Sequence, residues 1–225
     1  MAIADNYRRV TETINQACRA VGRNPEEVRL LPVTKGRSAA EIAQVIALGA
    51  GQVAENQVQE MSIKARELGA TSWVFIGHLQ RNKVPLACSV IAELQSLDSL
   101  RLAEALQRHL ERIDSDRRLP VLVEVNTSGE VTKHGLASDQ VLAFARSLKA
   151  YDRLEPRGLM TVAHPDPGLA DLGFARLAAL RSELWDRDGG GWAELSMGMS
   201  SDFDAAIAHG STCVRIGTAI FGASF

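Results

Sequence analysis

Short apolar runs alternate with longer segments of helical period along the whole 225-residue chain, and this alternation limits the possible folds more than any other feature. The runs are rich in Val, Ile and Leu, and no low-complexity linker interrupts them. Such a rhythm is typical of βαβ units, in which helices connect parallel strands. Strands are expected at 29–35, 52–56, 73–77, 90–97, 121–126, 156–162, 193–199 and 213–221.

Eight strands are the number that closes a (β/α)8 barrel of the TIM type. The chain is therefore predicted to be an α/β protein with one barrel domain over 1–225. An open doubly wound sheet is the main alternative, but the GxGxxG motif is absent and the alternation continues to the last residues. Helices are expected at 5–21, 38–49, 56–69, 80–87, 99–113, 137–150, 168–187 and 202–209.

Local capping signals support two of these helices. Ser38 stands three residues before Glu41, and Ser201 stands three residues before Asp204. A hydroxyl followed at this spacing by a carboxylate predicts a capping box at a helix start.

Charge and cysteine content narrow the function classes. The 25 basic and 27 acidic residues give a net charge of −2, which argues against a nucleic-acid binder. Three distant cysteines, Cys18, Cys88 and Cys213, indicate neither a disulfide framework nor a metal cluster. No signal-peptide core is present, and no apolar run reaches the ~18 residues that span a bilayer. A cytoplasmic protein without membrane attachment is expected.

Lys35 closes the first strand with the parity of Leu31 and Val33, so it is expected at the mouth of the barrel. Active sites of parallel barrels lie at the carboxyl ends of the strands. A solvated lysine at a strand end is one interpretation. The other is a Schiff-base lysine, whose partly desolvated amine attacks an aldehyde.

Arg215 lies inside the last predicted strand, flanked by Val214 and Ile216. Alternation puts it on one face with Cys213 and Gly217, either toward the barrel centre or toward the helices. A buried guanidinium needs a partner. It forms either a structural ion pair with a barrel carboxylate or a contact with a pyridine nitrogen, as in some sites for pyridoxal 5′-phosphate (PLP).

A phosphate site is expected after the last two strands, where barrels often bind this group. Ser200 or Ser201 offers a hydroxyl, and Gly217 lets the backbone of Thr218 approach an oxyanion closely. The serines can equally be plain helix caps.

Other polar residues at strand ends are individually ambiguous, since they also serve as caps and turn residues. The histidines at 78, 109, 134, 164 and 209 show no metal-binding spacing, so no metal is predicted. The remaining polar strand ends are Glu55, Asn56, His78, Gln80, Asn82, Lys83, Asn126, Thr127 and Ser128.

Several motifs together resemble the YggS/PROSC family of pyridoxal phosphate homeostasis proteins. They occur in family order over nearly the whole chain, and the last is long enough to be specific. Two departures are Ala54, where a glycine is common, and Arg81, where a serine is common. The motifs are PVTKGR at 32–37, AENQVQE at 54–60, FIGHLQRNK at 75–83, EVNTSGEVTKHGL at 124–136, RGLMT at 157–161 and SMGMSSDFDAAIAHGSTCVRIGTAIFG at 196–222.

The resemblance implies a fold-type III barrel like the N-terminal domain of alanine racemase, with PLP as a Schiff base on Lys35. It further implies that Arg215 faces the ring nitrogen and that Asn56 lies near the cofactor. Ser200, Gly217 and Thr218 would hold the phosphate.

A PLP barrel also suggests an amino-acid racemase or decarboxylase. Type III racemases resemble this barrel but add a β-domain that supplies a tyrosine, and here no second domain is expected after the last predicted strand. Neither Tyr7 nor Tyr151 is expected at the site, and two-base racemisation needs an acid/base on each face of the substrate. A non-catalytic carrier of PLP is therefore favoured, with no catalytic residue assigned. A racemase-like enzyme and a phosphosugar-handling barrel remain as alternatives.

The expected partners are PLP and, transiently, apo forms of PLP-dependent enzymes. A monomer is expected, because the second domain that forms the racemase dimer is not expected here.

Overall fold

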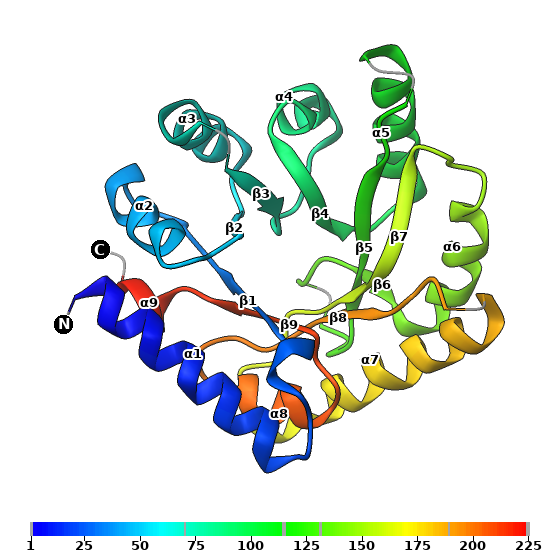
Figure 1. The fold of residues 1–225 in the computed structure, drawn as a ribbon. Helices are drawn as coiled ribbons and strands as arrows, with labels where there is room; N and C mark the ends of the chain where they lie inside the picture. The colour runs from blue at the N-terminus through cyan, green and yellow to red at the C-terminus, as the bar shows by residue number, and fades with distance from the viewer. Residues whose placement is uncertain (1, 70, 114–115, 131, 189, 224–225) are drawn as a thin grey trace.

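A barrel of parallel strands forms the centre of the structure, which is a computed structural model describing residues 2–69, 71–113, 116–130, 132–188 and 190–223 (Figure 1). The strands lie in the order β1-β9-β8-β7-β5-β4-β3-β2, and the short β6 pairs with β5. The expected (β/α)8 barrel is confirmed. The strands are β1 (Arg29–Pro32), β2 (Gln52–Glu55), β3 (Ser72–Phe75), β4 (Ile91–Leu97), β5 (Leu119–Asn126), β6 (Leu136–Ala137), β7 (Leu154–Met160), β8 (Glu194–Ser196) and β9 (Cys213–Ile216).

Helices surround the barrel, as Figure 1 shows. Among the described residues, no helix is both long and apolar enough to cross a membrane. The helices are α1 (Ile3–Ala20), α2 (Ala39–Ala47), α3 (Val58–Leu68), α4 (Val84–Cys88), α5 (Leu100–Ile113), α6 (Val141–Leu148), α7 (Pro167–Asp188), α8 (Phe203–Ala208) and α9 (Thr218–Phe221), with short 3-10 turns at Pro25–Glu27, Arg81–Lys83 and Ser138–Gln140.

The seam between β1 and β2 closes the barrel. Most other neighbouring strands pair at two or more positions, but among the described residues β1 and β2 are joined by a single parallel bridge, between Val33 and Ala54. One backbone hydrogen bond, from Thr34 N to Ala54 O at 2.9 Å, belongs to this contact. The seam therefore depends on few main-chain bonds.

One of the two expected capping boxes is present. The Ser38 hydroxyl accepts from Glu41 N, and the Glu41 carboxylate accepts from Ser38 N, so α2 begins as predicted. The prediction of a second capping box, formed by Ser201 and Asp204, was wrong. Helix α8 follows Asp202, whose carboxylate turns back and accepts from Met199 N at 2.6 Å.

The last strand is shorter than predicted, because the expected strand 213–221 ends at Ile216. Gly217 O accepts from Ile220 N at 3.0 Å and from Phe221 N at 2.9 Å, so the chain turns into α9 instead. Apolar residues continue through this turn, which is why the sequence pattern extended the strand too far.

The core has two parts. Most buried apolar side chains pack between the strands and the helices. A small second cluster lies on the inner face and contains Leu31, Ala54, Val74 and Cys213, all fully buried. The inner position of Cys213 settles the parity of β9: Arg215, two residues later, also points inward.

Gly158 on β7 marks a close approach between β7 and β8. A Cβ atom at this position would lie 1.9 Å from Glu194 O and 2.6 Å from Glu194 C. Because both atoms belong to the backbone of the paired strand, they cannot move without disturbing the sheet.

We expect Gly158→Ala to lower the free energy of unfolding by roughly 2–3 kcal/mol or more, as overpacking does. Urea denaturation followed by circular dichroism measures the change. The matched control is Gly51→Ala, where an added Cβ meets nothing within 4 Å, so stability should change by less than about 1 kcal/mol. Equal effects of the two substitutions would contradict the packing argument.

Candidate functional site

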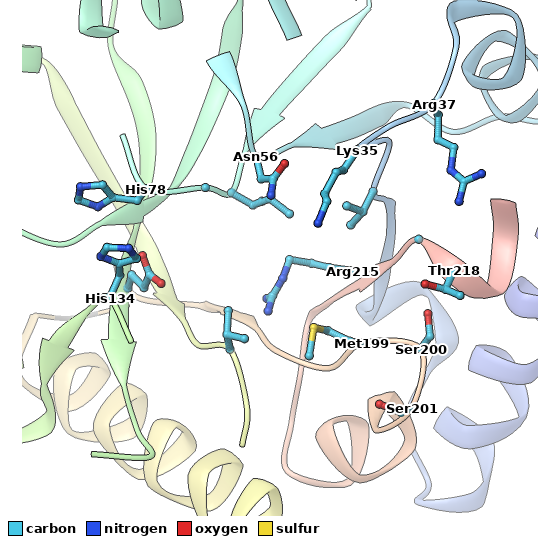
Figure 2. Close-up of a pocket in the computed structure, with 16 residues that line it drawn as sticks. Lys35, Arg37, Asn56, His78, His134, Met199, Ser200, Ser201, Arg215 and Thr218 are labelled. Atoms are coloured by element: carbon cyan, nitrogen blue, oxygen red, sulfur yellow. The ribbon is translucent and has the colours of Figure 1, made fainter. Parts of the chain in front are cut away.

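One cavity of about 580 Å³ lies at the carboxyl ends of the strands (Figure 2). All six residues assigned to the site from the sequence line it, although they come from four separate segments of the chain. They are Lys35, Asn56, Ser200, Arg215, Gly217 and Thr218.

Lys35 follows β1, and its side chain extends into the cavity in Figure 2. No hydrogen bond or ion pair of its amine is found within the described part of the chain. The residue is exposed, so the surrounding protein atoms do not supply the partial desolvation expected from the sequence. The amine is accessible to a ligand that enters the cavity.

The backbone on both sides of Lys35 is fixed by a buried lysine, Lys64 on α3. Lys64 Nζ donates to Thr34 O at 2.6 Å, to Glu55 Oε1 at 2.6 Å and to Glu60 Oε1 at 2.7 Å. Glu60 Oε1 also accepts from Gly36 N at 2.7 Å. The residues before and after Lys35 are therefore held by the same ion cluster.

Glu55 connects this cluster to Asn56. Its Oε2 accepts from Asn56 N at 2.9 Å, while its Oε1 accepts from the Thr34 hydroxyl at 3.2 Å. The Asn56 Oδ1 atom is buried and has no hydrogen-bond partner among the described residues. A buried acceptor without a partner is costly, so a donor from a bound ligand would stabilise it.

Arg215 lies at the floor of the cavity and is only 4% exposed. Its Nη1 donates to Ser196 Oγ and its Nη2 to Thr161 O, both at 2.7 Å. Burial lowers the pKa of Arg215, an effect that the nearby Cys213, Glu124 and Asp202 oppose. Within the described residues no carboxylate contacts the guanidinium directly, so the ion pair considered from the sequence is not formed.

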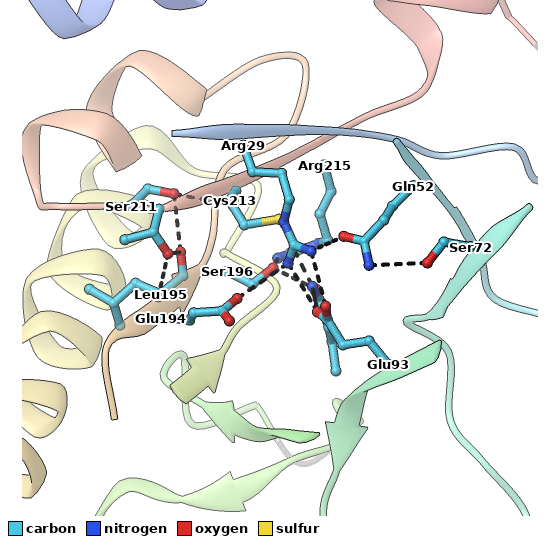
Figure 3. Close-up of polar contacts among 12 residues, drawn as sticks. Arg29, Gln52, Ser72, Glu93, Glu194, Leu195, Ser196, Ser211, Cys213 and Arg215 are labelled. Atoms are coloured by element: carbon cyan, nitrogen blue, oxygen red, sulfur yellow. Dashed lines mark hydrogen bonds and ion pairs between the residues drawn. The ribbon is translucent and has the colours of Figure 1, made fainter. Parts of the chain in front are cut away.

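A chain of hydrogen bonds continues from Arg215 through the barrel interior (Figure 3). Ser196 Oγ donates to Gln95 Oε1 at 2.6 Å, and Gln95 Nε2 donates to Glu93 Oε1 at 2.6 Å. Glu93 accepts two bonds from Arg29, each 3.0 Å long. The Arg215 side chain is thus anchored to a bidentate ion pair at the opposite end of the barrel.

Ser200 and Thr218 lie at the rim of the cavity next to the turn after β9 (Figure 2). The Ser200 hydroxyl accepts from Ala219 N at 3.4 Å, which joins the two segments. Gly217 sits between them, and a Cβ there would lie 3.2 Å from Val33 O. The absence of a side chain at Gly217 lets the turn after β9 pack closely against Val33.

The cavity has further lining residues besides the six assigned to the site from the sequence. Glu124 is the most informative: burial raises its pKa to about 7, Asp98 adds to the rise, and Arg215 opposes it. Glu124 lies on β5 two residues before Asn126, so strand alternation puts both side chains on the same face. This alternation could have predicted Glu124 from the sequence. The others are Val33, Arg37, Ile76, Gly77, His78, His134, Val162, Met199 and Ser201.

The two tyrosines lie elsewhere. Tyr7 lines a cleft together with Arg29 and Gln52, at the amino ends of β1 and β2, and Tyr151 lines a depression near Trp192. Neither tyrosine lines the cavity that contains Lys35.

Comparison with known proteins identifies the family. Residues 1–225 match the family described as "Alanine racemase, N-terminal domain". The "Pyridoxal phosphate homeostasis protein" of Pseudomonas aeruginosa is 39% identical, over 98% of this chain and 95% of that protein. The human protein of the same name is 37% identical, over 96% of this chain and 84% of that protein.

Solved structures agree with this assignment. PipY of Synechococcus elongatus, solved with PLP bound, has a TM-score of 0.80 and 30% identity, over 93% of this chain and all of that one. An alanine racemase from Corynebacterium glutamicum, at 17% identity and a TM-score of 0.71, shares the fold. The chain therefore belongs to the family of pyridoxal phosphate homeostasis proteins, which is built on the barrel of the alanine racemase N-terminal domain.

Proposed function

We propose that this protein binds PLP in the cavity, through a Schiff base on Lys35, and acts in PLP homeostasis. The observation that carries the proposal is that one cavity of about 580 Å³ brings together an accessible amine, a buried guanidinium and a hydroxyl-lined rim. These groups match the aldehyde, the ring nitrogen and the phosphate of PLP. In forming the Schiff base, the Lys35 nitrogen makes a C=N bond with the aldehyde carbon, and one water leaves.

The residues present fit this cofactor. The unpaired Asn56 Oδ1 suits a hydrogen-bond donor on the ring or on the Schiff-base nitrogen. At the other end, Ser200 and Thr218 hydroxyls suit phosphate oxygens, and Gly217 lines the cavity beside them. Bound PLP supplies an electrophilic aldehyde and an aromatic ring that can accept electrons.

Arg215 is the main reason to favour a carrier over an enzyme. A guanidinium that faces the ring nitrogen keeps this nitrogen unprotonated, because a second positive charge beside it is disfavoured. An unprotonated ring withdraws electrons less strongly, which limits carbanion chemistry. The hydrogen bonds that Arg215 donates to Ser196 Oγ and Thr161 O keep the guanidinium in place.

The positions of the tyrosines also support a carrier. A second acid/base must reach the substrate for racemisation by two bases, and Tyr7 and Tyr151 line other depressions. We propose reversible binding that buffers this reactive aldehyde and delivers it to apo-enzymes. Racemase-like activity is the alternative.

The proposal includes one domain over 1–225, a monomeric state and a cytoplasmic location. The described cysteines Cys18, Cys88 and Cys213 are all free and buried, which suits a reducing compartment. The molar mass from light scattering, measured on protein eluted from a size-exclusion column, tests the monomeric state. Fluorescence microscopy of the tagged protein tests the cytoplasmic location.

We expect Lys35→Ala to abolish the Schiff-base absorbance and the adduct left by borohydride reduction, since Lys35 is the only lysine among the described residues that line the cavity. Mass spectrometry of digested protein should locate the pyridoxyl group on Lys35 in the wild type. Lys149→Ala is the control, because this lysine is exposed and its one ion pair among the described residues is with Asp188. An adduct mapped to another residue would contradict the assignment.

Ser200→Ala and Thr218→Val should each weaken PLP binding about tenfold, the usual cost of losing a hydrogen bond to a charged group. Binding of pyridoxal, which lacks the phosphate, should change little. Ser201→Ala tests the neighbouring hydroxyl and should have a smaller effect. Equal losses for PLP and pyridoxal would show that these hydroxyls do not contact the phosphate.

Incubation of the holoprotein with amino acids in deuterium oxide separates a carrier from a racemase. We expect deuterium to enter the α-position no faster than with free PLP, and Lys35→Ala should not change this background. Exchange at an ordinary enzymatic rate that Lys35→Ala removes would establish the racemase alternative.

A further inference from the structure

Three potential metal ligands meet at the rim of the cavity. His78 follows β3, Asp98 follows β4, and His134 lies between β5 and β6. Because β3, β4 and β5 are neighbours in the sheet, their carboxyl ends lie side by side. The strand order therefore brings His78, Asp98 and His134 together, although they are far apart in the sequence.

The ligand atoms of this group are close. One atom from each residue lies within 4.8 Å of the other two, and His78 Nδ1 is 3.1 Å from Asp98 Oδ2. The two imidazole rings stack, with centroids 4.1 Å apart and an interplanar angle of 11° (Figure 2). Two imidazoles and a carboxylate are a donor set that suits divalent transition metals.

Close backbone packing fixes the segments that carry both histidines. Next to His78, a Cβ on Gly77 would lie 2.1 Å from Asn56 O, and Gly77 O accepts from Ser96 Oγ at 2.6 Å. Next to His134, Gly135 has a φ of +104°, and a Cβ there would lie 2.8 Å from Asn126 N. The backbone thus places both rings at this rim.

We propose that His78, Asp98 and His134 form a binding site for a divalent transition metal ion of the Zn²⁺ class. Ligand atoms bound to one ion at about 2.0–2.2 Å lie at most roughly 4.4 Å apart, so a small inward movement closes the set. The stacked rings must turn about their side-chain bonds so that both nitrogens face the ion. His78 and His134 are exposed, which leaves room for this rotation.

Three protein ligands leave at least one coordination position open. Both histidines line the cavity that contains Lys35, so an ion here would add positive charge at its mouth. Arg81 and Arg101 line the depression beside Asp98 and disfavour a cation there. The expected affinity is therefore micromolar, weaker than that of a structural zinc site.

The site does not require PLP, and it departs from the expectation of no metal drawn from the histidine spacing. The metal site is tested on the Lys35→Ala protein. This substitution prevents PLP bound on Lys35 from chelating the added ion. Titration calorimetry with Zn²⁺ should show one saturable equivalent. His78→Asn and His134→Asn should each weaken binding at least about tenfold.

His209→Asn is the matched control, because His209 Nε2 also pairs with a carboxylate, Asp171 Oδ1 at 2.8 Å, but forms no part of such a group among the described residues. It should leave binding unchanged. X-ray absorption of the Zn²⁺ complex should show nitrogen and oxygen ligands at about 2.0–2.1 Å and no sulfur at about 2.3 Å. Thermal unfolding confirms that each variant is folded.

The absence of saturable Zn²⁺ binding would overturn the proposal. So would affinities that stay unchanged in both His78→Asn and His134→Asn, or a sulfur signal in the absorption spectrum. All three outcomes are independent of whether the wild-type protein binds PLP on Lys35.

Discussion

The buried guanidinium of Arg215 is the constraint on which the site depends. A charge at this depth is tolerated only with hydrogen-bond partners, and here both described partners are neutral oxygens, Ser196 Oγ and Thr161 O. The Ser196 hydroxyl donates a hydrogen bond to Gln95, and Gln95 donates in turn to the Glu93 carboxylate, which pairs with Arg29. These bonds hold the Arg215 side chain at the floor of the cavity.

Strand ends and strand parity were enough to predict the principal residues of the site. Lys35 ends an apolar run, and Arg215 interrupts one, so the sequence pattern alone marks both residues. Their meeting in one cavity follows from the parallel barrel, since all strands end at the same side. The Schiff base itself came from the family resemblance, because the sequence pattern alone fits a solvated lysine equally well.

Other features were not accessible from the sequence for identifiable reasons. Lys64 looks like an ordinary helix lysine with Glu60 at i,i−4, and only the fold brings it to Glu55 and Thr34. His134 lies in the segment between β5 and β6, and the pattern of apolar residues does not predict where such a connection lies in the fold. The strand expected at 213–221 was too long because helix α9 is as apolar as the strand before it.

The weakly bridged seam between β1 and β2 has side-chain contacts at both ends. Arg29 donates to Gln52 at one end, and Lys64 joins Thr34 to Glu55 at the other. Between most other strands, backbone hydrogen bonds set the register of the barrel, and these bonds do not depend on which side chains are present. At the seam, the register depends on the side chains of Arg29, Gln52, Lys64 and Glu55. Substitutions at these few positions can therefore change the backbone beside Lys35 while the rest of the barrel keeps its geometry.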